Sequence, residues 1–170
     1  MYCHVTSNNI LAAEQYGFRN NSSTETAAYN LTNNISEALN SNKWVGGIFC
    51  DLTKAFDCVN HNILLSKLEF YGITGRAMNL IKSYLGDRYQ RVRIKNKHLK
   101  QHFSEWNKVK QGVPQGSILG PLFFILYIKD LPGFVKETQA SKPTLYADDT
   151  SIIITRSNSI AFKEEINSVV

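Results

Sequence analysis

Three stretches in the first half of the chain carry apolar side chains at the three- and four-residue spacing of an amphipathic helix. The first spans about residues 23–40 and begins behind a serine that can cap it. The second follows Asn60 and stops near Gly72, and the third runs from Gly75 to about Gly86. Each has one apolar face, so we expect the three helices to supply core faces and to cover a sheet.

Residues 44–52 form a short, mostly apolar run with Asp51 near its end. Such a run is typical of a buried central strand, which places Cys50 in the interior and Asp51 at the edge of the sheet. A sheet edge is a common place for ligand-binding groups, so Asp51 becomes a candidate site residue.

Residues 89–109 alternate between polar and apolar positions and predict a hairpin that turns around Asn96-Lys97. One face of its first strand is basic and carries Arg91, Arg93 and Lys95. The other face carries Val92 and Ile94, which we expect to be packed.

An apolar helix over residues 122–130 follows the Gly- and Pro-containing segment 111–121. Gly112 and Gly116 permit unusual backbone angles and the close approach of a ligand, while Ser117 can cap the helix. The alternative to a ligand-binding loop is that segment 111–121 is an ordinary structural connection that caps a helix. Residues 133–143 form a polar connection to a last strand region.

The order of elements is helix, strand, two helices, basic hairpin, helix and hairpin. This order predicts an α+β fold in which helices pack on one face of an antiparallel sheet. Residues 1–5 show no pattern that would start a helix or a strand, and residues 160–170 end within a helical pattern. We therefore expect a fragment of a longer protein.

Composition and charge fit a single globular domain that faces a polyanion. Of the 170 residues, 43% are hydrophobic and 19% are charged, and the net charge is +5. The stretch from residue 88 to residue 110 has only one acid, Glu105. Its eight basic residues are Arg88, Arg91, Arg93, Lys95, Lys97, Lys100, Lys108 and Lys110. They suit a phosphate backbone, or they only protect an edge ribbon from aggregation.

The sequence also excludes several classes of protein. Cys3, Cys50 and Cys58 form no CxxC pair, so neither a zinc site nor a disulfide framework is indicated. The most apolar stretch, residues 118–128, is too short to span a membrane, and we expect no signal peptide. We therefore expect an intracellular protein of the cytoplasm or nucleus that is not secreted.

Two adjacent aspartates, Asp148 and Asp149, interrupt the strand-like segment 144–154. Asp is depleted from strands, so we interpret the segment as a hairpin with both aspartates at its tip. An ordinary Asx turn is the alternative. Together with Asp51, the pair forms a carboxylate cluster that suits two Mg²⁺ ions roughly 3.5–4 Å apart, or Mn²⁺ in their place, for phosphoryl transfer.

Four blocks in this order carry a family resemblance. They are Gln15-Tyr16-Gly17-Phe18-Arg19 with Ser22-Ser23-Thr24; Phe49-Cys50-Asp51-Leu52-Thr53-Lys54-Ala55-Phe56-Asp57; Gln111-Gly112-Val113-Pro114-Gln115-Gly116-Ser117-Ile118-Leu119-Gly120-Pro121; and Tyr146-Ala147-Asp148-Asp149. The chain resembles the fingers and palm of reverse transcriptases from non-LTR, jockey-like retrotransposons. The resemblance implies residues 1–43 as part of the fingers and residues 44–170 as mainly palm, with a basic hairpin near 88–110 and no thumb.

The resemblance also implies roles. Asp51, Asp148 and Asp149 become the catalytic, metal-binding residues, and Tyr146 lies next to the primer terminus. The residues implied to contact the incoming nucleotide are Lys54, Ala55, Phe56, Gln115 and Gly116. Phe56 resembles the gate that favours deoxynucleotides, although an ordinary core aromatic is the alternative. The partners would be an RNA template, a DNA primer and dNTPs, with Arg91, Arg93 and Lys95 along the template or primer backbone.

Other residues in or beside these blocks have two interpretations or a structural one. Arg19 would contact the template or the triphosphate, or it would form a salt bridge within the fingers. Asp57 and His61 are interpreted as local turn and helix-start groups, and Cys50 and Cys58 as packing residues.

Two rival functions remain. An RNA-dependent RNA polymerase would use the same acids, but Phe56 argues against it. An inactive or domesticated remnant would only bind nucleic acid, and the three intact aspartates argue against that. The fingers' triphosphate-gripping residues would precede Met1, and the thumb would follow Val170, so we expect the isolated fragment to be incomplete as a polymerase.

Overall fold

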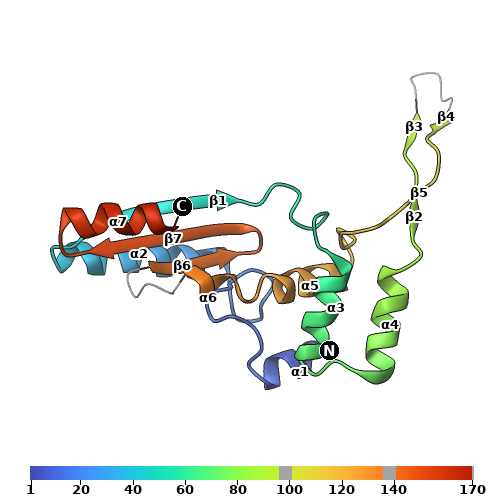
Figure 1. Ribbon diagram of the computed structural model, residues 1–170, viewed down its shortest axis with the longest axis horizontal. Coiled ribbons are helices and arrows are strands. Elements are labelled where there is room, and N and C mark those ends of the chain that lie inside the picture. The colour runs from blue at the N-terminus through green and yellow to red at the C-terminus, as the bar shows by residue number, and fades with distance from the viewer. Residues whose placement is uncertain (96–100, 136–140, 170) are drawn as a thin grey trace.

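The computed structural model describes residues 1–95, 101–135 and 141–169 (Figure 1). The helices in these ranges are α1 (Tyr2–Ser7), α2 (Thr24–Asn40), α3 (His61–Phe70), α4 (Gly75–Leu85), α5 (Leu119–Tyr127), α6 (Leu131–Val135) and α7 (Ser159–Val169). The strands are β1 (Trp44–Asp51), β2 (Tyr89–Gln90), β3 (Arg93–Lys95), β4 (Gln101–Phe103), β5 (Asn107–Lys108), β6 (Ser141–Tyr146) and β7 (Asp149–Arg156).

The main sheet contains three antiparallel strands in the order β1-β7-β6. The expectation that residues 44–52 form a buried central strand is wrong, because β7 occupies the centre and β1 lies at the edge. Cys50 is exposed rather than interior. The apolar run of β1 is broken by Gly46 and Gly47, and apolar runs alone do not distinguish a central strand from an edge strand.

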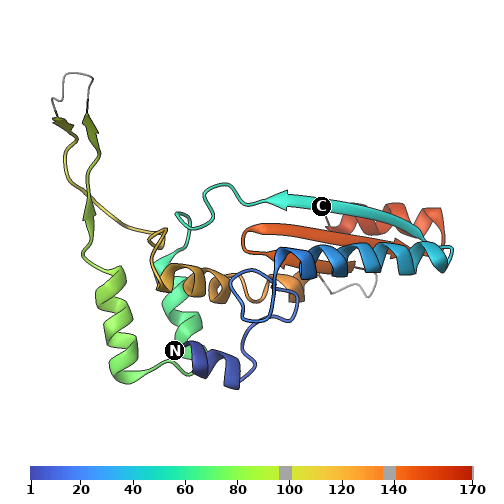
Figure 2. The same cartoon turned by 180° about the vertical axis from the view of Figure 1, so that it is seen from behind.

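Helices cover both faces of this sheet, where we expected one. On one face, a Cβ added at Gly46 would lie 2.6 Å from the ring of Phe162 in α7. On the other face, the Lys142 ammonium donates to Asn34 and Glu37 of α2. The two views show α7 and α2 on opposite sides of the strands (Figures 1 and 2). The α+β class with an antiparallel sheet is confirmed.

A second layer of core lies between α3, α4 and α5. α5 is buried on nearly all sides, with Phe123 and Phe124 at most 1% exposed. The apolar faces predicted for α3 and α4 meet it through residues such as Leu64 and Ile81. This packing fixes the segments that lead into α3 and into α5, which include two of the predicted site blocks.

Most of the predicted helices are confirmed, with differences at their ends. Ser23 caps α2 in a reciprocal capping box with Thr26, and the Asn60 side chain caps α3. α5 begins at Leu119, three residues earlier than expected, because a proline is tolerated in a first helical turn. The short helices α1 and α6 were not expected from the sequence, since each is too short to show a periodic pattern.

The basic hairpin is confirmed as a ribbon that projects from the helices (Figure 1). We call it the arm and define it as residues 88–95 and 101–110. It is built from the antiparallel pairs β2–β5 and β3–β4. The predicted turn at Asn96-Lys97 and the basic residue Lys100 lie outside the described residues. The expectation that Val92 and Ile94 form a packed face is wrong, because both side chains are exposed.

Candidate functional site

Asp148 and Asp149 lie at the tip of the β6–β7 hairpin, as predicted. Tyr146 pairs with Asp149, so Ala147 and Asp148 form the connecting loop. Ala147 has φ 56°, in the left-handed region that glycine favours. A non-glycine residue held in this region needs support from its surroundings.

That support comes from Gln15, whose side chain is buried beside the loop. Its amide Oε1 accepts hydrogen bonds from Ala147 N at 3.0 Å and from Gly17 N at 2.8 Å. Its Nε2 donates to Ala147 O at 3.3 Å. A Cβ added at Gly17 would lie 2.3 Å from Ala147 N, so only glycine permits this approach.

The backbone on either side of Gln15 is also attached to β6. Tyr16 N donates to Leu145 O, and Leu145 N donates to Glu14 O. No role was predicted for Gln15, because its partner is 132 residues away and no local pattern marks the contact. The presence of Gln15 and Gly17 in the first of the four family blocks was the only available signal.

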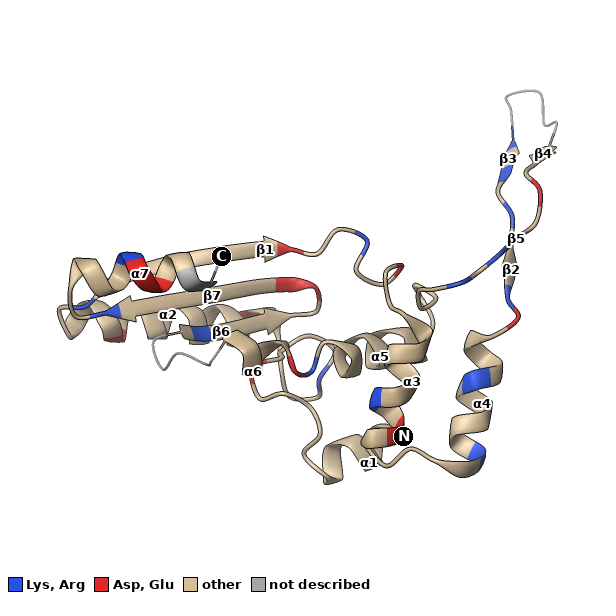
Figure 3. Ribbon diagram, viewed as in Figure 1, with Lys and Arg blue, Asp and Glu red and all other residues tan. Residues whose placement is uncertain are grey.

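The sheet register places Asp51 directly opposite Asp149. Both are exposed, and Asp148 in the loop is half-buried. Figure 3 shows acidic residues at the end of β1 and at the β6–β7 tip, where the two strands meet. Directly opposed like charges destabilise a strand pair, so a cation would relieve the repulsion.

The donor chemistry fits a hard divalent cation, because the carboxylates of Asp51, Asp148 and Asp149 have no side-chain partner within the described residues. Across residues 1–95, 101–135 and 141–169, however, no three His, Cys, Asp or Glu side chains are grouped closely enough to hold a metal ion. The structure therefore brings Asp51 and Asp149 into register, while the three-carboxylate metal site stays a prediction.

The two central blocks are joined by hydrogen bonds. Val113 N donates to Phe56 O, and Gly112 N donates to Val59 O, both at 2.8 Å. The His61 ring nitrogen lies 2.8 Å from Gly112 O. The interpretation of His61 as a purely local group is therefore incomplete, since it starts α3 and also holds a loop 51 residues away.

Gly112 permits the close contact between these blocks. Its φ is 89°, and an added Cβ would lie 2.9 Å from Asp57 O. Further along, the Ser117 hydroxyl donates to Pro114 O and accepts from Gly120 N in the first turn of α5. This agrees with the expected capping role of Ser117.

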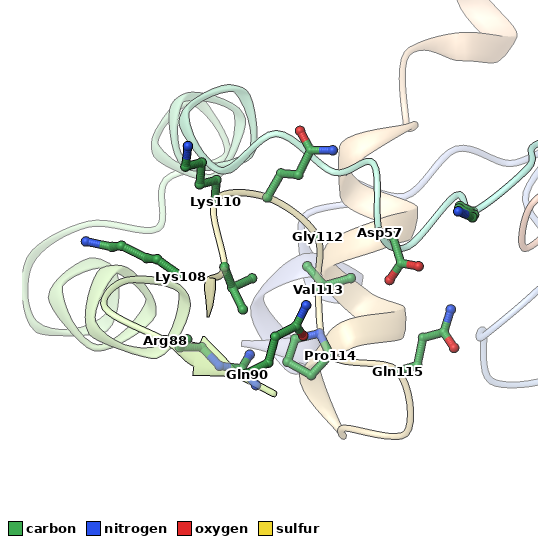
Figure 4. A pocket seen from close by; sticks show the side chains of 12 residues that line it. Asp57, Arg88, Gln90, Lys108, Lys110, Gly112, Val113, Pro114 and Gln115 are labelled. Atoms are coloured by element: carbon green, nitrogen blue, oxygen red, sulfur yellow. The ribbon is translucent and has the colours of Figure 1, made fainter. Parts of the chain in front are cut away.

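A basic cavity of about 580 Å³ lies between these blocks and the base of the arm (Figure 4). Two predicted nucleotide-binding residues, Lys54 and Gln115, line it. The other charged residues that line it are Asp57, Arg88, Lys108 and Lys110. Sequence reasoning placed the last three in a basic stretch without assigning them to a pocket, because only the fold brings them to Gln115.

Asp51 and Ala55 line a different cavity of about 340 Å³, together with Cys58, Phe124 and Tyr127. Cys58 is exposed, so its interpretation as a packing residue is wrong. Of the predicted nucleotide-binding residues, Lys54 and Gln115 thus line the first cavity and Ala55 the second, while Phe56 and Gly116 line neither.

Phe56 lies between two aromatic rings. Its ring stacks on Phe124 of α5 with centroids 4.6 Å apart, and Phe18 approaches it edge-on at 6.1 Å. These contacts give Phe56 a packing role. Its predicted role at the nucleotide sugar stays a prediction.

The remaining predicted residues are dispersed. Tyr146 is half-buried beside the β6–β7 tip, and Gly116 is exposed with φ 77°. Arg19 forms no ion pair within the described residues; its guanidinium donates to Ala12 O and Gln15 O. Arg91, Arg93 and Lys95 are exposed on the arm, away from the aspartates (Figure 3).

An ion pair stands at the base of the arm. Lys108 Nζ lies 2.8 Å from Asp87 Oδ1. This hydrogen bond and charge lower the pKa of the Asp87 carboxyl and raise the pKa of the Lys108 ammonium. Lys108 therefore keeps its positive charge at the rim of the basic cavity.

An antiparallel sheet with two aspartates in register at one end, beside a glycine loop and a basic cavity, has the architecture of a palm-type nucleic acid polymerase. Residues 1–169 match the family model described as reverse transcriptase (RNA-dependent DNA polymerase). The chain belongs to this family, and the expected resemblance is confirmed.

Relatives from mobile elements of Drosophila melanogaster agree with this assignment. The chain is 33% identical over 159 residues to a probable RNA-directed DNA polymerase from transposon BS, covering 88% of this chain. It is 31% identical over 150 residues to the RNA-directed DNA polymerase from mobile element jockey, covering 86%. In each case the chain spans 16% of the relative's length.

Solved structures support the fold. Apo telomerase from Candida tropicalis matches 98% of this chain with a TM-score of 0.63 and 17% identity, and the match covers 32% of the telomerase chain. Telomerase from Candida albicans, solved with a fragment of telomeric RNA, matches 92% with a TM-score of 0.59 and 14% identity, over 29% of its length. These likenesses confirm a reverse transcriptase fingers and palm fold.

Proposed function

We propose that the chain is part of the catalytic core of an RNA-directed DNA polymerase of a mobile element. The observation that carries this proposal is the register of Asp51 opposite Asp149, next to Asp148, at the open end of a palm-like sheet. The chain would extend a DNA primer on an RNA template with dNTPs. Residues 44–169 would form most of the palm.

Asp51, Asp148 and Asp149 would hold two Mg²⁺ ions, or Mn²⁺ in their place. When bound, the metal would activate the primer 3′-OH and stabilise the charge on the departing pyrophosphate. The chain's own contribution is to bring acids from distant segments to one end of the sheet. Gln15 supports it by holding the loop that carries Asp148.

The basic cavity would accommodate the charged part of the nucleotide or the template strand. Lys54 and Arg88 are two of its cationic lining residues, and Gln115 supplies an amide at its wall. Binding of this kind recognises phosphate and shape, and the base sequence is read by pairing with the template. Phe56 would limit the space at the sugar from its position on Phe124.

The partners and the compartment follow from this chemistry. The arm residues Arg91, Arg93 and Lys95 would contact the template or primer backbone. A polymerase of this kind would act in the cytoplasm or nucleus. Within the residues that the structure describes, none of the helices combines the length and the apolar character needed to cross a lipid bilayer.

Primer extension by the complete parent protein tests the proposal. The substrate is an RNA template annealed to a DNA primer, with dNTPs and Mg²⁺. Asp149→Asn keeps the size of the side chain and removes its charge, so we expect extension to fall by about 10³-fold or more, since it removes a predicted metal ligand. Asp51→Asn and Asp148→Asn should do the same.

Glu69→Gln is the matched control, because Glu69 is an exposed carboxylate on α3 that lies outside the site. It should leave extension unchanged. Extension by Asp149→Asn at the parent rate would refute the assignment. Preferential use of ribonucleotides would favour an RNA polymerase, and RNA binding without any extension would favour a remnant that only binds nucleic acid.

A further inference from the structure

The arm exposes large apolar side chains that a folded chain normally covers. Tyr89 and Trp106 are 59% and 57% exposed, and Phe103 is 48% exposed. Val92 and Ile94, on the face that the sequence predicted to be packed, are 61% and 62% exposed. Exposed apolar residues gathered on both faces of one projecting element mark an interaction surface.

Two of the exposed rings, those of Phe103 and Trp106, are held by Arg91 rather than by a core. The Arg91 guanidinium lies 4.2 Å from the ring centroid of Phe103 and 4.5 Å from that of Trp106. Cation–π contacts of this kind stabilise the rings in place while leaving much of their surface open. A two-stranded ribbon is only marginally stable by itself, so these contacts also help to keep the arm folded.

The charge of the arm indicates what it binds. Its described residues include six Lys and Arg residues and one acidic residue, Glu105. The six are Arg88, Arg91, Arg93, Lys95, Lys108 and Lys110. Positive charge interleaved with exposed aromatic rings is the combination that binds single-stranded nucleic acid, since the charges meet phosphates and the rings stack on bases.

The arm is also continuous with the candidate site. Arg88 and Lys108, at its base, line the 580 Å³ cavity that extends to Gln115. A strand that lies along the arm would therefore lead toward the predicted nucleotide-binding residues. A duplex fits the exposed rings poorly, because its bases already stack on one another.

We propose that the arm is a binding site for single-stranded nucleic acid, with unpaired bases stacked on Trp106 and Tyr89 and with phosphates beside Arg93 and Lys95. This rests on the proposed function only for the choice of nucleic acid as the partner. It adds that the strand is unpaired there and that aromatic residues, as well as basic ones, hold it.

Tryptophan fluorescence offers a direct test, because the chain contains only two tryptophans, Trp44 and Trp106. Trp44 is 54% exposed and lies on β1 beside Phe162 of α7, outside the arm. The complete 170-residue chain with Trp44→Phe reports on Trp106 alone, and the chain with Trp106→Phe reports on Trp44 alone. Each is titrated with a single-stranded RNA of about 12 nucleotides and with a duplex of the same sequence, in EDTA.

We expect saturable quenching of Trp106 by the single strand and no quenching of Trp44. The single strand should bind at least about tenfold more tightly than the duplex. For chains that lack Trp106, the affinity is measured by the fluorescence anisotropy of a dye-labelled RNA, and Trp106→Ala should weaken the binding by about 5- to 100-fold. Trp106→Phe keeps a ring and should retain most of the affinity. Arg93→Gln should reduce the dependence on salt by about one phosphate contact.

Equal affinity for the duplex, or unchanged affinity in a folded Trp106→Ala chain, would overturn the proposal. If Trp106→Ala unfolds the arm, the comparison of Trp106→Phe with Trp106→Leu decides instead, because loss with Leu and retention with Phe requires a ring. Absence of any quenching also overturns it and directs attention to a protein partner. EDTA separates this result from catalysis, which primer extension by the Asp149→Asn parent tests independently.

Discussion

Replacement of Gln15 by Met should destabilise the chain strongly and locally. Met has nearly the volume of Gln but cannot make hydrogen bonds of comparable strength, so the change removes the amide without opening a large cavity. Three backbone groups would lose their side-chain partner: Ala147 N–H, Ala147 C=O and Gly17 N–H.

The magnitude follows from their burial. Ala147 is 8% exposed and Gln15 is 2% exposed, so water cannot easily replace the amide. Each buried group left without a partner costs about 1–3 kcal/mol. The bond to Ala147 O is long, and the three costs are not additive, so we expect a loss of about 3–5 kcal/mol in the free energy of unfolding.

Urea denaturation followed by circular dichroism measures this loss. With a slope of about 2 kcal/mol/M, the midpoint should fall by about 1.5–2.5 M. Gln111→Met is the matched control, since Gln111 is exposed and makes no side-chain hydrogen bond within the described residues. Its midpoint should move by less than about 0.3 M, as expected for a surface substitution.

Amide hydrogen exchange gives the local readout. The N–H groups of Ala147 and Gly17 should exchange faster in Gln15→Met even under conditions where the rest of the sheet stays protected. A loss below about 1 kcal/mol with an unchanged slope would show that the amide is not what holds the loop, and the reasoning about Gln15 would be wrong.

Three further predictions concern neighbouring contacts. Gly112→Ala should lower the unfolding free energy by about 2 kcal/mol or more in urea melts, because its φ is 89° and the new Cβ meets Asp57 O; Gly133→Ala, with nothing within 4 Å, is the control, and equal effects would contradict this. Phe56→Ala should cost about 2–4 kcal/mol through the lost stack on Phe124, and it should raise ribonucleotide incorporation by the parent protein; a change in stability without a change in sugar selectivity would leave Phe56 a packing residue only. Burial is the largest single effect on Asp130 and raises its pKa, but the hydrogen bond to Lys67, a backbone hydrogen bond and the charges of Lys67 and Lys129 together outweigh it and lower the pKa. These contacts therefore stabilise the fold above the unfolded pKa, and their contribution is lost as the pH falls through the folded pKa. Lys67→Met should therefore raise the pKa of Asp130 in an NMR titration and make stability less sensitive to acid, and an unchanged titration would refute the contact.

The sequence determined the local elements with strong periodic or capping signals. α2, α3 and α4 follow from apolar spacing and from caps such as Ser23 and Asn60, which act within a few residues. The β6–β7 hairpin followed from two aspartates that interrupt a strand pattern. The ordered family blocks then identified the α+β polymerase fold, because those motifs combine local signals over nearly the whole chain.

Only the tertiary structure decided which segments meet. It placed β1 at the edge of the sheet, left Val92 and Ile94 exposed, and brought Arg88 and Gln115 to the same cavity. It also attached Gln15 to Ala147 across 132 residues. Hydrophobic periodicity reports which face of an element is apolar, but pairing order and burial depend on what the rest of the chain places against that face.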